Sequence, residues 1–199
     1  MQSDESVIFS ADVDIDTCSS FNAASFFGWT RASVIDENIS PHPCGVYPQP
    51  IPVDHLTGLA AMPYDFAELA GYNKIDFLHL AVYDNFTSRQ EILELDAKEP
   101  KWELLTKASV CPKLFQLAKH HALLAKIKPT SVLELADVLA LIRPAKRQYE
   151  DLYLAQRGKI RPLLFLKEMS EAYAFKKSHA ISYAKVICLQ LHLIELNRL

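Results

Sequence analysis

The sequence has little glycine and cysteine, and it lacks any long hydrophobic run. Only 5 of its 199 residues are Gly, while half are apolar, which excludes a fibrous repeat and a disordered chain. No apolar run is long enough to span a bilayer, and no basic-then-apolar leader follows Met1, so we expect neither a membrane segment nor a secretory signal. The four cysteines are scattered without a CxxC pair. Scattered thiols are typical of a reducing compartment, which predicts a cytoplasmic protein.

One set of metal-ligand residue types occurs at His42-Pro43-Cys44, with His55 and His79 further along. Their spacing matches no recognised zinc motif, and unligated His and Cys are much commoner than zinc ligands. The sequence alone therefore does not lead us to predict a zinc site.

Charge is unevenly distributed along the chain. Residues 1–100 contain 4 Lys and Arg against 16 Asp and Glu, a net charge of −12, whereas residues 101–199 contain 17 against 8, a net charge of +9. An acidic half could bind cations and a basic half could bind phosphate groups. Such a charge distribution suits a polyanionic ligand. Chance segregation, or two halves that pair with each other, would give the same pattern.

The hydrophobic period changes along the chain and predicts an α+β fold. Residues 12–16 and 74–83 have the composition of strands, and the helical period begins near residue 86. Helices are expected over 114–127, 131–142, 146–157, 163–177 and 178–197. We therefore predict two domains, a small β-containing half over 1–99 and an all-helical basic half over 100–199.

Local signals mark the ends of two of these predicted helices. Ser131, with Glu134 three residues later, has the capping-box pattern that begins a helix. The basic stretch Arg157–Pro162 is predicted to connect the helices at 146–157 and 163–177.

Three carboxylates, Asp12, Asp14 and Asp16, alternate with Val13 and Ile15 in the first predicted strand. Because side chains alternate along a strand, the carboxylates share one face at spacings of about 6–7 Å, and the apolar pair is predicted to face a core. A divalent cation would relieve the repulsion between the carboxylates. On this stretch alone, a solvated acidic face is the simpler interpretation.

Asp76 is the only carboxylate in the second predicted strand, whose other polar residues are Lys74 and His79. A carboxylate in so apolar a run is costly unless it is paired, hydrogen-bonded or bound to a cation. Asp76 is therefore the most informative residue of the first half. The alternative interpretation of Asp76 is an ordinary Asp at a frayed strand end. The alternative interpretation of Lys74 is a Lys at a strand end that pairs with an acidic neighbour.

Six short elements follow one another in a recognisable order. They are Ala11–Thr17, His42–Val46, Lys74–Leu80, Phe115-Gln116 with Ile127–Thr130, Ala140–Ala145, and Tyr173–Ala184. In this order they resemble the motifs P-D-x-D-x-D-F, H-x-x-G-V, K-[FI]-D-F-L-G-L, F-Q with L-K-P-T, A-L-x-R-P-G-P, and Y-G-F-N-K-S-H-A-x-A-Y-A of the bacterial DNA polymerase III alpha subunit. The chain thus resembles the palm and fingers region of the family C DNA polymerases.

The chain also departs from this family. Among the motif positions that carry other residues are Ala11, Thr17, His79, Ala145 and Lys176. The Gly/Ser-rich palm loop of the family is not found, and the segment between Arg143 and Tyr173 is too short for its arginine-rich nucleotide-binding segment. We therefore expect a heavily shortened palm-plus-fingers form, of the kind that a phage would encode.

The resemblance implies a DNA-directed DNA polymerase that uses two Mg²⁺ ions, with Mn²⁺ as an alternative. Asp12, Asp14 and Asp76 match the catalytic, metal-binding carboxylates, and Asp16 lies outside this set. The positions that match nucleotide- or DNA-binding residues are Lys74, Arg143, Tyr173, Lys177, Ser178 and His179. The implied ligands are primer–template DNA and dNTPs, with a second polymerase chain or host replication proteins as further partners.

Two other functions compete with this interpretation. An inactive relative of a polymerase would bind DNA or a replisome partner, and a metal-dependent nuclease would use the same carboxylates. Retention of all three carboxylates favours the polymerase, whereas the missing Gly/Ser-rich loop favours the inactive relative. The motif order gives no support to the nuclease.

Overall fold

We describe the fold from a computed structural model, which describes residues 13–166 and 175–199. The chain divides into two compact units, Met1–Asp84 and Asn85–Leu199. The described part of the first unit contains a β-sheet with short helices, and that of the second contains helices only, so the predicted α+β class is confirmed.

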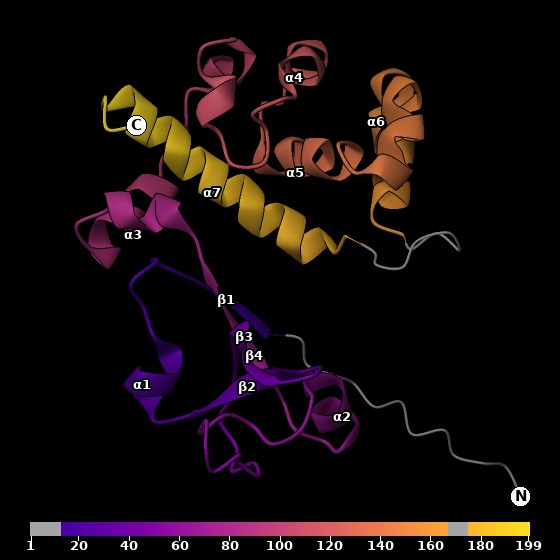
Figure 1. The fold of residues 1–199 in the computed structure, drawn as a ribbon. Coiled ribbons are helices and arrows are strands. Elements are labelled where there is room, and N and C mark those ends of the chain that lie inside the picture. The colour runs from indigo at the N-terminus through magenta and orange to yellow at the C-terminus, as the bar shows by residue number, and fades with distance from the viewer. Residues whose placement is uncertain (1–12, 167–174) are drawn as a thin grey trace, which may run out of the picture. The chain divides into compact units, whose positions relative to one another are not determined.

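The first unit contains a four-stranded mixed sheet in the order β1-β4-β3-β2 (Figure 1). Its strands are β1 (Val13–Thr17), β2 (Thr30–Ile35), β3 (Ile39–Tyr47) and β4 (Ile75–His79), and its short helices are α1 (Ala23–Phe27), α2 (Tyr64–Leu69) and the 3₁₀ helix η1 (Ala81–Asn85). Strands β1 and β4 are parallel, and the other neighbours are antiparallel. Of the strand predicted at 74–83, Ile75–His79 form the inner strand β4, whereas the prediction was wrong from Ala81 onward, where η1 begins. The acidic strand β1 lies at the edge.

The apolar face of β1 is more exposed than predicted. Val13 and Ile15 are 41% and 40% exposed. On that face of the sheet, Phe77 of β4 and Val46 of β3 are buried together with Ala23 of α1. The hydrophobic cluster covers the inner strands, so the prediction that Val13 and Ile15 face a core was wrong.

The second unit consists of helices. They are α3 (Arg89–Asp96), η2 (Trp102–Thr106), η3 (Cys111–Lys113), α4 (His121–Ile127), α5 (Val132–Leu141), η4 (Pro144–Tyr149), α6 (Glu150–Leu164) and α7 (Lys177–Glu195). Helices α5 and α7 pack against each other around a core that includes Leu124, Leu135, Leu139, Ile187 and Leu191. In the described ranges, no helix is both long enough and apolar enough to cross a membrane.

Helix α3 belongs to the second unit, whereas the predicted domain boundary placed it in the first. Lys185 of α7 forms an ion pair with Asp96 at 2.6 Å, and Arg198 donates hydrogen bonds to Glu91 and to the carbonyl of Asn85. These contacts join the start of the unit to its carboxyl-terminal end.

The predicted N-cap at Ser131 is confirmed, but Glu134 accepts from the residue before the one that a capping box uses. Ser131 Oγ accepts a hydrogen bond from the Glu134 amide at 3.2 Å, and Glu134 Oε2 accepts one from the Thr130 amide at 2.9 Å. By contrast, the predicted helix over 114–127 was wrong over its first part. Gln116 has a φ of 56°, and the Phe115 amide donates to a side-chain oxygen of Gln190 in α7 instead of continuing a helix.

Helix α6 runs through Arg157–Pro162, which the sequence had predicted to be a connector. The helix has non-helical backbone angles at Gln156 and continues beyond it. Arg157 donates to the Ile127 carbonyl at 2.6 Å and to Glu134 at 2.7 Å, so tertiary contacts hold this stretch in place. Of the helix predicted over 163–177, residues 167–174 lie outside the described residues.

Candidate functional site

The two acidic strands lie side by side, with Asp14 of β1 directly opposite Asp76 of β4. Neighbouring strands are about 4.8 Å apart, and paired residues project to the same face of a sheet. Both carboxylates are half-buried. The sheet therefore brings together two of the three carboxylates that the sequence singled out, although they are 62 positions apart in the chain. Asp12, the third, lies outside the described residues.

Asp16 has a separate environment on β1. Its register partner on β4 is Leu78, and its carboxylate accepts a hydrogen bond from the Tyr83 hydroxyl at 3.4 Å. The assignment of Asp16 outside the catalytic set stays a prediction.

Lys74 lies just before β4 and forms an ion pair with Asp76. Its Nζ is 2.5 Å from each carboxylate oxygen, and the two side chains are only 20% and 16% exposed. The same Nζ lies 5.7 Å from the centre of the Tyr64 ring, within the range of a cation–π contact. This ion pair is the contact that the strand-end alternative for Lys74 describes. A phosphate-binding role would require the ammonium group to leave Asp76.

Gly45 of β3 leaves the space that this cluster fills. It is the register partner of Asp76. A Cβ atom at this position would lie 2.8 Å from both His42 Nδ1 and Lys74 Cδ, and 3.0 Å from Asp76 Oδ1. Because carbon atoms do not approach polar or apolar neighbours so closely without displacement, the site requires glycine here.

His42 extends the cluster on the β3 side. Its Nδ1 accepts hydrogen bonds from the Gly45 amide at 2.9 Å and the Cys44 amide at 3.4 Å. Burial, together with the positive charge of Lys74, lowers the pKa of His42. Although Nδ1 is only 4.0 Å from Asp76 Oδ1, its lone pair points to backbone amides. We therefore treat the imidazole as neutral, so the contact between His42 and Asp76 is not an ion pair.

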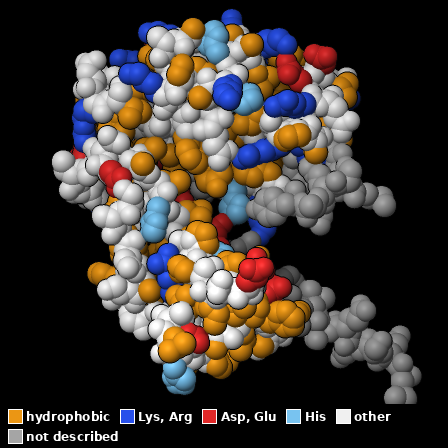
Figure 2. Space-filling view, viewed as in Figure 1, with side chains coloured by type: hydrophobic (Ala, Val, Ile, Leu, Met, Phe, Trp, Pro, Cys, Tyr) orange, Lys and Arg blue, Asp and Glu red, His pale blue; other side chains and the backbone are white. Residues whose placement is uncertain are grey.

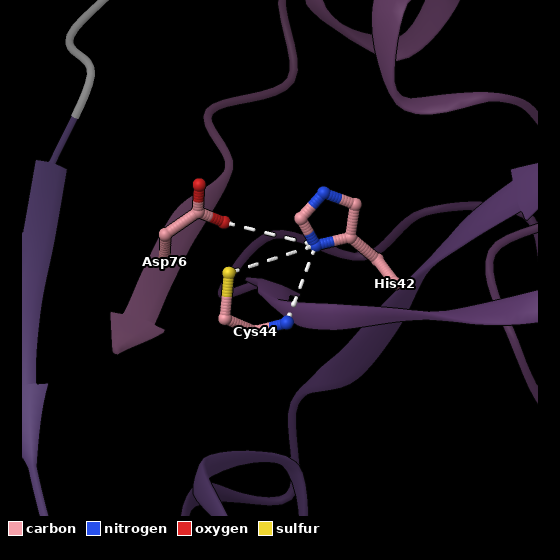
Figure 3. A group of neighbouring side chains, drawn as sticks. All are labelled: His42, Cys44 and Asp76. Carbon is pink, nitrogen blue, oxygen red and sulfur yellow. Dashed lines mark hydrogen bonds and ion pairs between the residues drawn. The ribbon is translucent and has the colours of Figure 1, made fainter. Parts of the chain in front are cut away.

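Cys44 completes a group of three different ligand types. Its Sγ is 3.9 Å from His42 Nδ1 (Figure 3), and burial, with the nearby Asp76 charge, raises its pKa to about 11. The ligand atoms of His42, Cys44 and Asp76 all lie within 4.8 Å of one another. The sequence analysis considered His42 and Cys44 with His55 and His79 and predicted no metal site from them; the structure places Asp76 beside them instead.

The two other histidines considered from the sequence lie elsewhere. His55 is exposed in a loop, and His79 at the end of β4 interacts through Nε2 with the Phe21 carbonyl at 2.8 Å. Only strand pairing could reveal that Asp76 is the third neighbour of His42 and Cys44.

A cavity of about 240 Å³ is lined by residues of the loop before α1, by Arg31, Phe77 and His79, and also by Cys44 and Gly45. Arg31 donates to the carbonyls of His42 and Pro43, at 3.2 and 3.3 Å, and so supports the backbone of the His42 cluster. No carboxylate lines this cavity, so we do not assign it to the same chemistry.

In the second unit, the Arg143 side chain contacts Gln116 and Phe175. Its Nη2 donates to Gln116 Oε1 at 2.5 Å, its guanidinium lies 4.2 Å from the centre of the Phe175 ring, and its Nε is buried without a hydrogen-bond partner. The side chain is half-buried rather than freely exposed to a phosphate. The alternative interpretation, that Arg143 is an ordinary surface residue, also does not describe this half-buried side chain.

The other predicted nucleotide-binding residues lie at the start of α7. Lys177 and Ser178 are exposed in its first turn, and His179 is half-buried, with its ring stacked at 6.3 Å from that of Tyr183. Tyr173 lies outside the described residues. The first amides of a helix of this length favour anions, which agrees with a phosphate-binding role for Lys177 and Ser178.

Comparison with known proteins identifies no relative. Neither the protein-family models nor the curated protein sequences contain a match to this chain.

Proposed function

We propose that the chain is a shortened family C DNA polymerase, acting alone or with a second chain, that transfers nucleotides from dNTPs to a primer 3′-hydroxyl. The observation that carries this proposal is the register of β1 and β4, which sets Asp14 opposite Asp76 on adjacent parallel strands. Two carboxylates at this spacing, with a third two residues upstream in Asp12, form the oxygen-rich set that two-metal nucleotidyl transfer requires.

The donor chemistry of the described residues fits Mg²⁺. Asp14 and Asp76 offer hard oxygen ligands on one face of a sheet, and Gly45 keeps a third strand from filling the space beside them. When bound, Mg²⁺ would lower the pKa of the primer hydroxyl and neutralise charge on the leaving pyrophosphate.

Lys74 would act as a phosphate ligand in this site. Its ammonium group now neutralises Asp76, and it would have to leave that carboxylate when a metal ion binds there. The triphosphate of a dNTP offers the ammonium a new partner of the same charge sign as the carboxylate. Lys74 would then couple nucleotide binding to release of Asp76.

The second unit has the charge expected of a DNA-binding partner for this site. Residues 85–199 contain 19 Lys and Arg against 12 Asp and Glu. In Figure 2, Lys and Arg side chains are numerous on the visible face of the helical unit, and acidic side chains are fewer there. Binding through such a surface depends on counterion release and weakens as salt is added.

The second candidate function is that of an inactive relative that binds DNA or a replisome protein. The observation that favours it is the same Lys74–Asp76 ion pair, because a carboxylate held at 2.5 Å by an ammonium group is already neutralised without a metal. Descent from a polymerase would then explain the motifs, and the basic helical unit would provide the remaining function.

A primer-extension assay with Mg²⁺ separates the two functions. The parent chain is expected to extend a primer, alone or with host replication proteins, and Asp14→Asn is expected to abolish extension. Asp16→Asn, on the same strand, and Glu37→Gln, at an exposed turn, are the matched controls and should extend normally. DNA binding without extension by the parent would support the inactive relative, and equal extension by Asp14→Asn would refute the site.

A further inference from the structure

The group of His42, Cys44 and Asp76 has ligand chemistry that magnesium catalysis does not use. It offers one imidazole nitrogen, one sulfur and one carboxylate, all within 4.8 Å (Figure 3). Mg²⁺ selects oxygen ligands, whereas mixed nitrogen, sulfur and oxygen sets are typical of Zn²⁺. Magnesium coordination therefore does not account for Cys44 and His42 beside Asp76, although His42 also matches the H-x-x-G-V motif of the family that the chain resembles.

We propose that His42, Cys44 and Asp76 bind one Zn²⁺ ion, with the fourth position open to water or another oxygen ligand. Three protein ligands and one open position form a common type of zinc coordination. The proposal does not rest on the polymerase function, because binding of the ion requires neither DNA nor catalysis.

The distances between the ligand atoms are close to those of a tetrahedral zinc site. His42 Nδ1 lies 4.0 Å from Asp76 Oδ1 and 3.9 Å from Cys44 Sγ. With bonds of about 2.0–2.3 Å, a tetrahedral Zn²⁺ ion separates its ligand atoms by roughly 3.3–3.6 Å. A contraction of about half an ångström would bring these two pairs to zinc-binding separations. The Cys44–Asp76 pair, which is at most 4.8 Å apart, would contract by up to about 1.3 Å.

Three existing interactions must change when the ion binds. The lone pair of His42 Nδ1 must turn from the Gly45 and Cys44 amides to the metal, and Lys74 must release Asp76. The Tyr64 ring, 5.7 Å from Lys74 Nζ, offers that ammonium group a nearby alternative. The Cys44 thiol gives its proton to solvent as the zinc–sulfur bond forms, and the neutral His42 has none to lose from Nδ1.

Lys74 is consequently a competitor of the metal. Its positive charge occupies both oxygens of Asp76 and repels a second cation at the same position. Replacement of Lys74 by Met keeps the aliphatic stem beside Gly45 and removes the charge. This variant should therefore bind Zn²⁺ more tightly than the parent, which distinguishes the proposed site from adventitious binding elsewhere.

The test uses Co²⁺ as a spectroscopic substitute for Zn²⁺ on the purified full chain. One equivalent of Co²⁺ is expected to give a thiolate-to-cobalt charge-transfer band and tetrahedral ligand-field bands, and added Zn²⁺ should remove both. Because loss of even an outer-shell partner weakens metal sites by about 10–100-fold, Cys44→Ser and His42→Ala should each weaken binding by at least about 100-fold. Lys74→Met should strengthen it by about tenfold or more.

Matched controls come from the same unit. Cys18→Ser and His55→Ala change residues of the same types outside the group and should leave the cobalt spectrum unchanged. A parent chain without the charge-transfer band, a band that survives Cys44→Ser, or a band lost in Cys18→Ser would overturn the proposal. Circular dichroism checks that each variant folds, and Lys74→Met tests the site by a gain that misfolding would not produce.

Discussion

Gly45→Ala is a sharp test of the packing that forms the candidate site. The added Cβ would lie 2.8 Å from His42 Nδ1 and from Lys74 Cδ. Ordinary contact requires about 3.5–4.0 Å, so each neighbour would have to move by about 0.7 Å or more. Neither moves freely, because Nδ1 accepts from the Gly45 amide and Lys74 is held by Asp76. Overpacking of this kind costs about 1–3 kcal/mol of folding free energy.

The two tryptophans allow this loss to be assigned to one unit. Trp29, which stacks on Phe27 with ring centres 4.4 Å apart, lies in the first unit, and Trp102 lies in the second. In a Trp102→Phe background, urea unfolding followed by Trp29 fluorescence should show a midpoint lowered by about 1 M.

Gly158→Ala is the matched control, because no atom lies within 4 Å of the Cβ that it would add. Because Gly158 lies in α6 of the second unit, this control is followed by Trp102 fluorescence in a Trp29→Phe background, where stability should be unchanged or higher by up to about 1 kcal/mol. An unchanged midpoint for Gly45→Ala would refute the close packing described for this site.

Two further predictions concern the second unit. Asp137 is buried and accepts hydrogen bonds from Tyr153 at 2.6 Å and Arg161 at 2.7 Å. Arg161→Met should therefore leave the Asp137 charge uncompensated and lower the free energy of unfolding by about 3 kcal/mol. Urea unfolding followed by Trp102 fluorescence measures this loss. A loss below about 1 kcal/mol would contradict this account. Hydrogen bonds from Arg198 and Thr87 lower the pKa of Glu91 from 4.5 to about 2. Glu91 should therefore stabilise the fold fully above pH 4.5, and this contribution should be lost as the pH falls towards 2. Glu91→Gln should therefore flatten the fall of the unfolding midpoint in that range, and an equally steep fall would show that Glu91 does not cause it.

The local elements of this fold could be predicted where one residue pattern decided the outcome. The acidic strand β1, the inner strand β4 and the Ser131 cap of α5 follow from alternation, apolar composition and capping chemistry. The α+β class follows from the same signals. The partner strand of β1 could not be predicted, because register depends on how distant segments pack.

The errors have physical causes in contacts between distant residues. The helix predicted from residue 114 is replaced at first by turns, because Gln190 of α7 binds the Phe115 amide. Helix α6 passes through Gly158 and Pro162, two residues that weaken helices, because Arg157 and Arg161 bond to neighbouring helical segments. Intrinsic propensity was overridden by tertiary structure in both places.

In the candidate site, too, single residues could be predicted from the sequence, whereas contacts that depend on strand pairing could not. Asp76 was singled out from its own sequence context, since a carboxylate in an apolar strand requires an explanation. The roles of Asp14 and Lys74 were implied by the resemblance to the family C polymerases and stay predictions. The contributions of Gly45, His42 and Cys44 depend on the pairing of β3 with β4, which brings Gly45 opposite Asp76. No spacing in the sequence encodes that pairing.

The central claim is that Asp14 and Asp76 act in one nucleotidyl-transfer site. Its most direct test is the rate of single-nucleotide incorporation into a primer by the parent, by Asp14→Asn, by Asp76→Asn and by the double variant. Residues that act as a unit give strongly non-additive losses, so the double variant should be about as inactive as either single variant. Losses that multiply in the double variant, or a parent chain that incorporates no nucleotide, would contradict the claim.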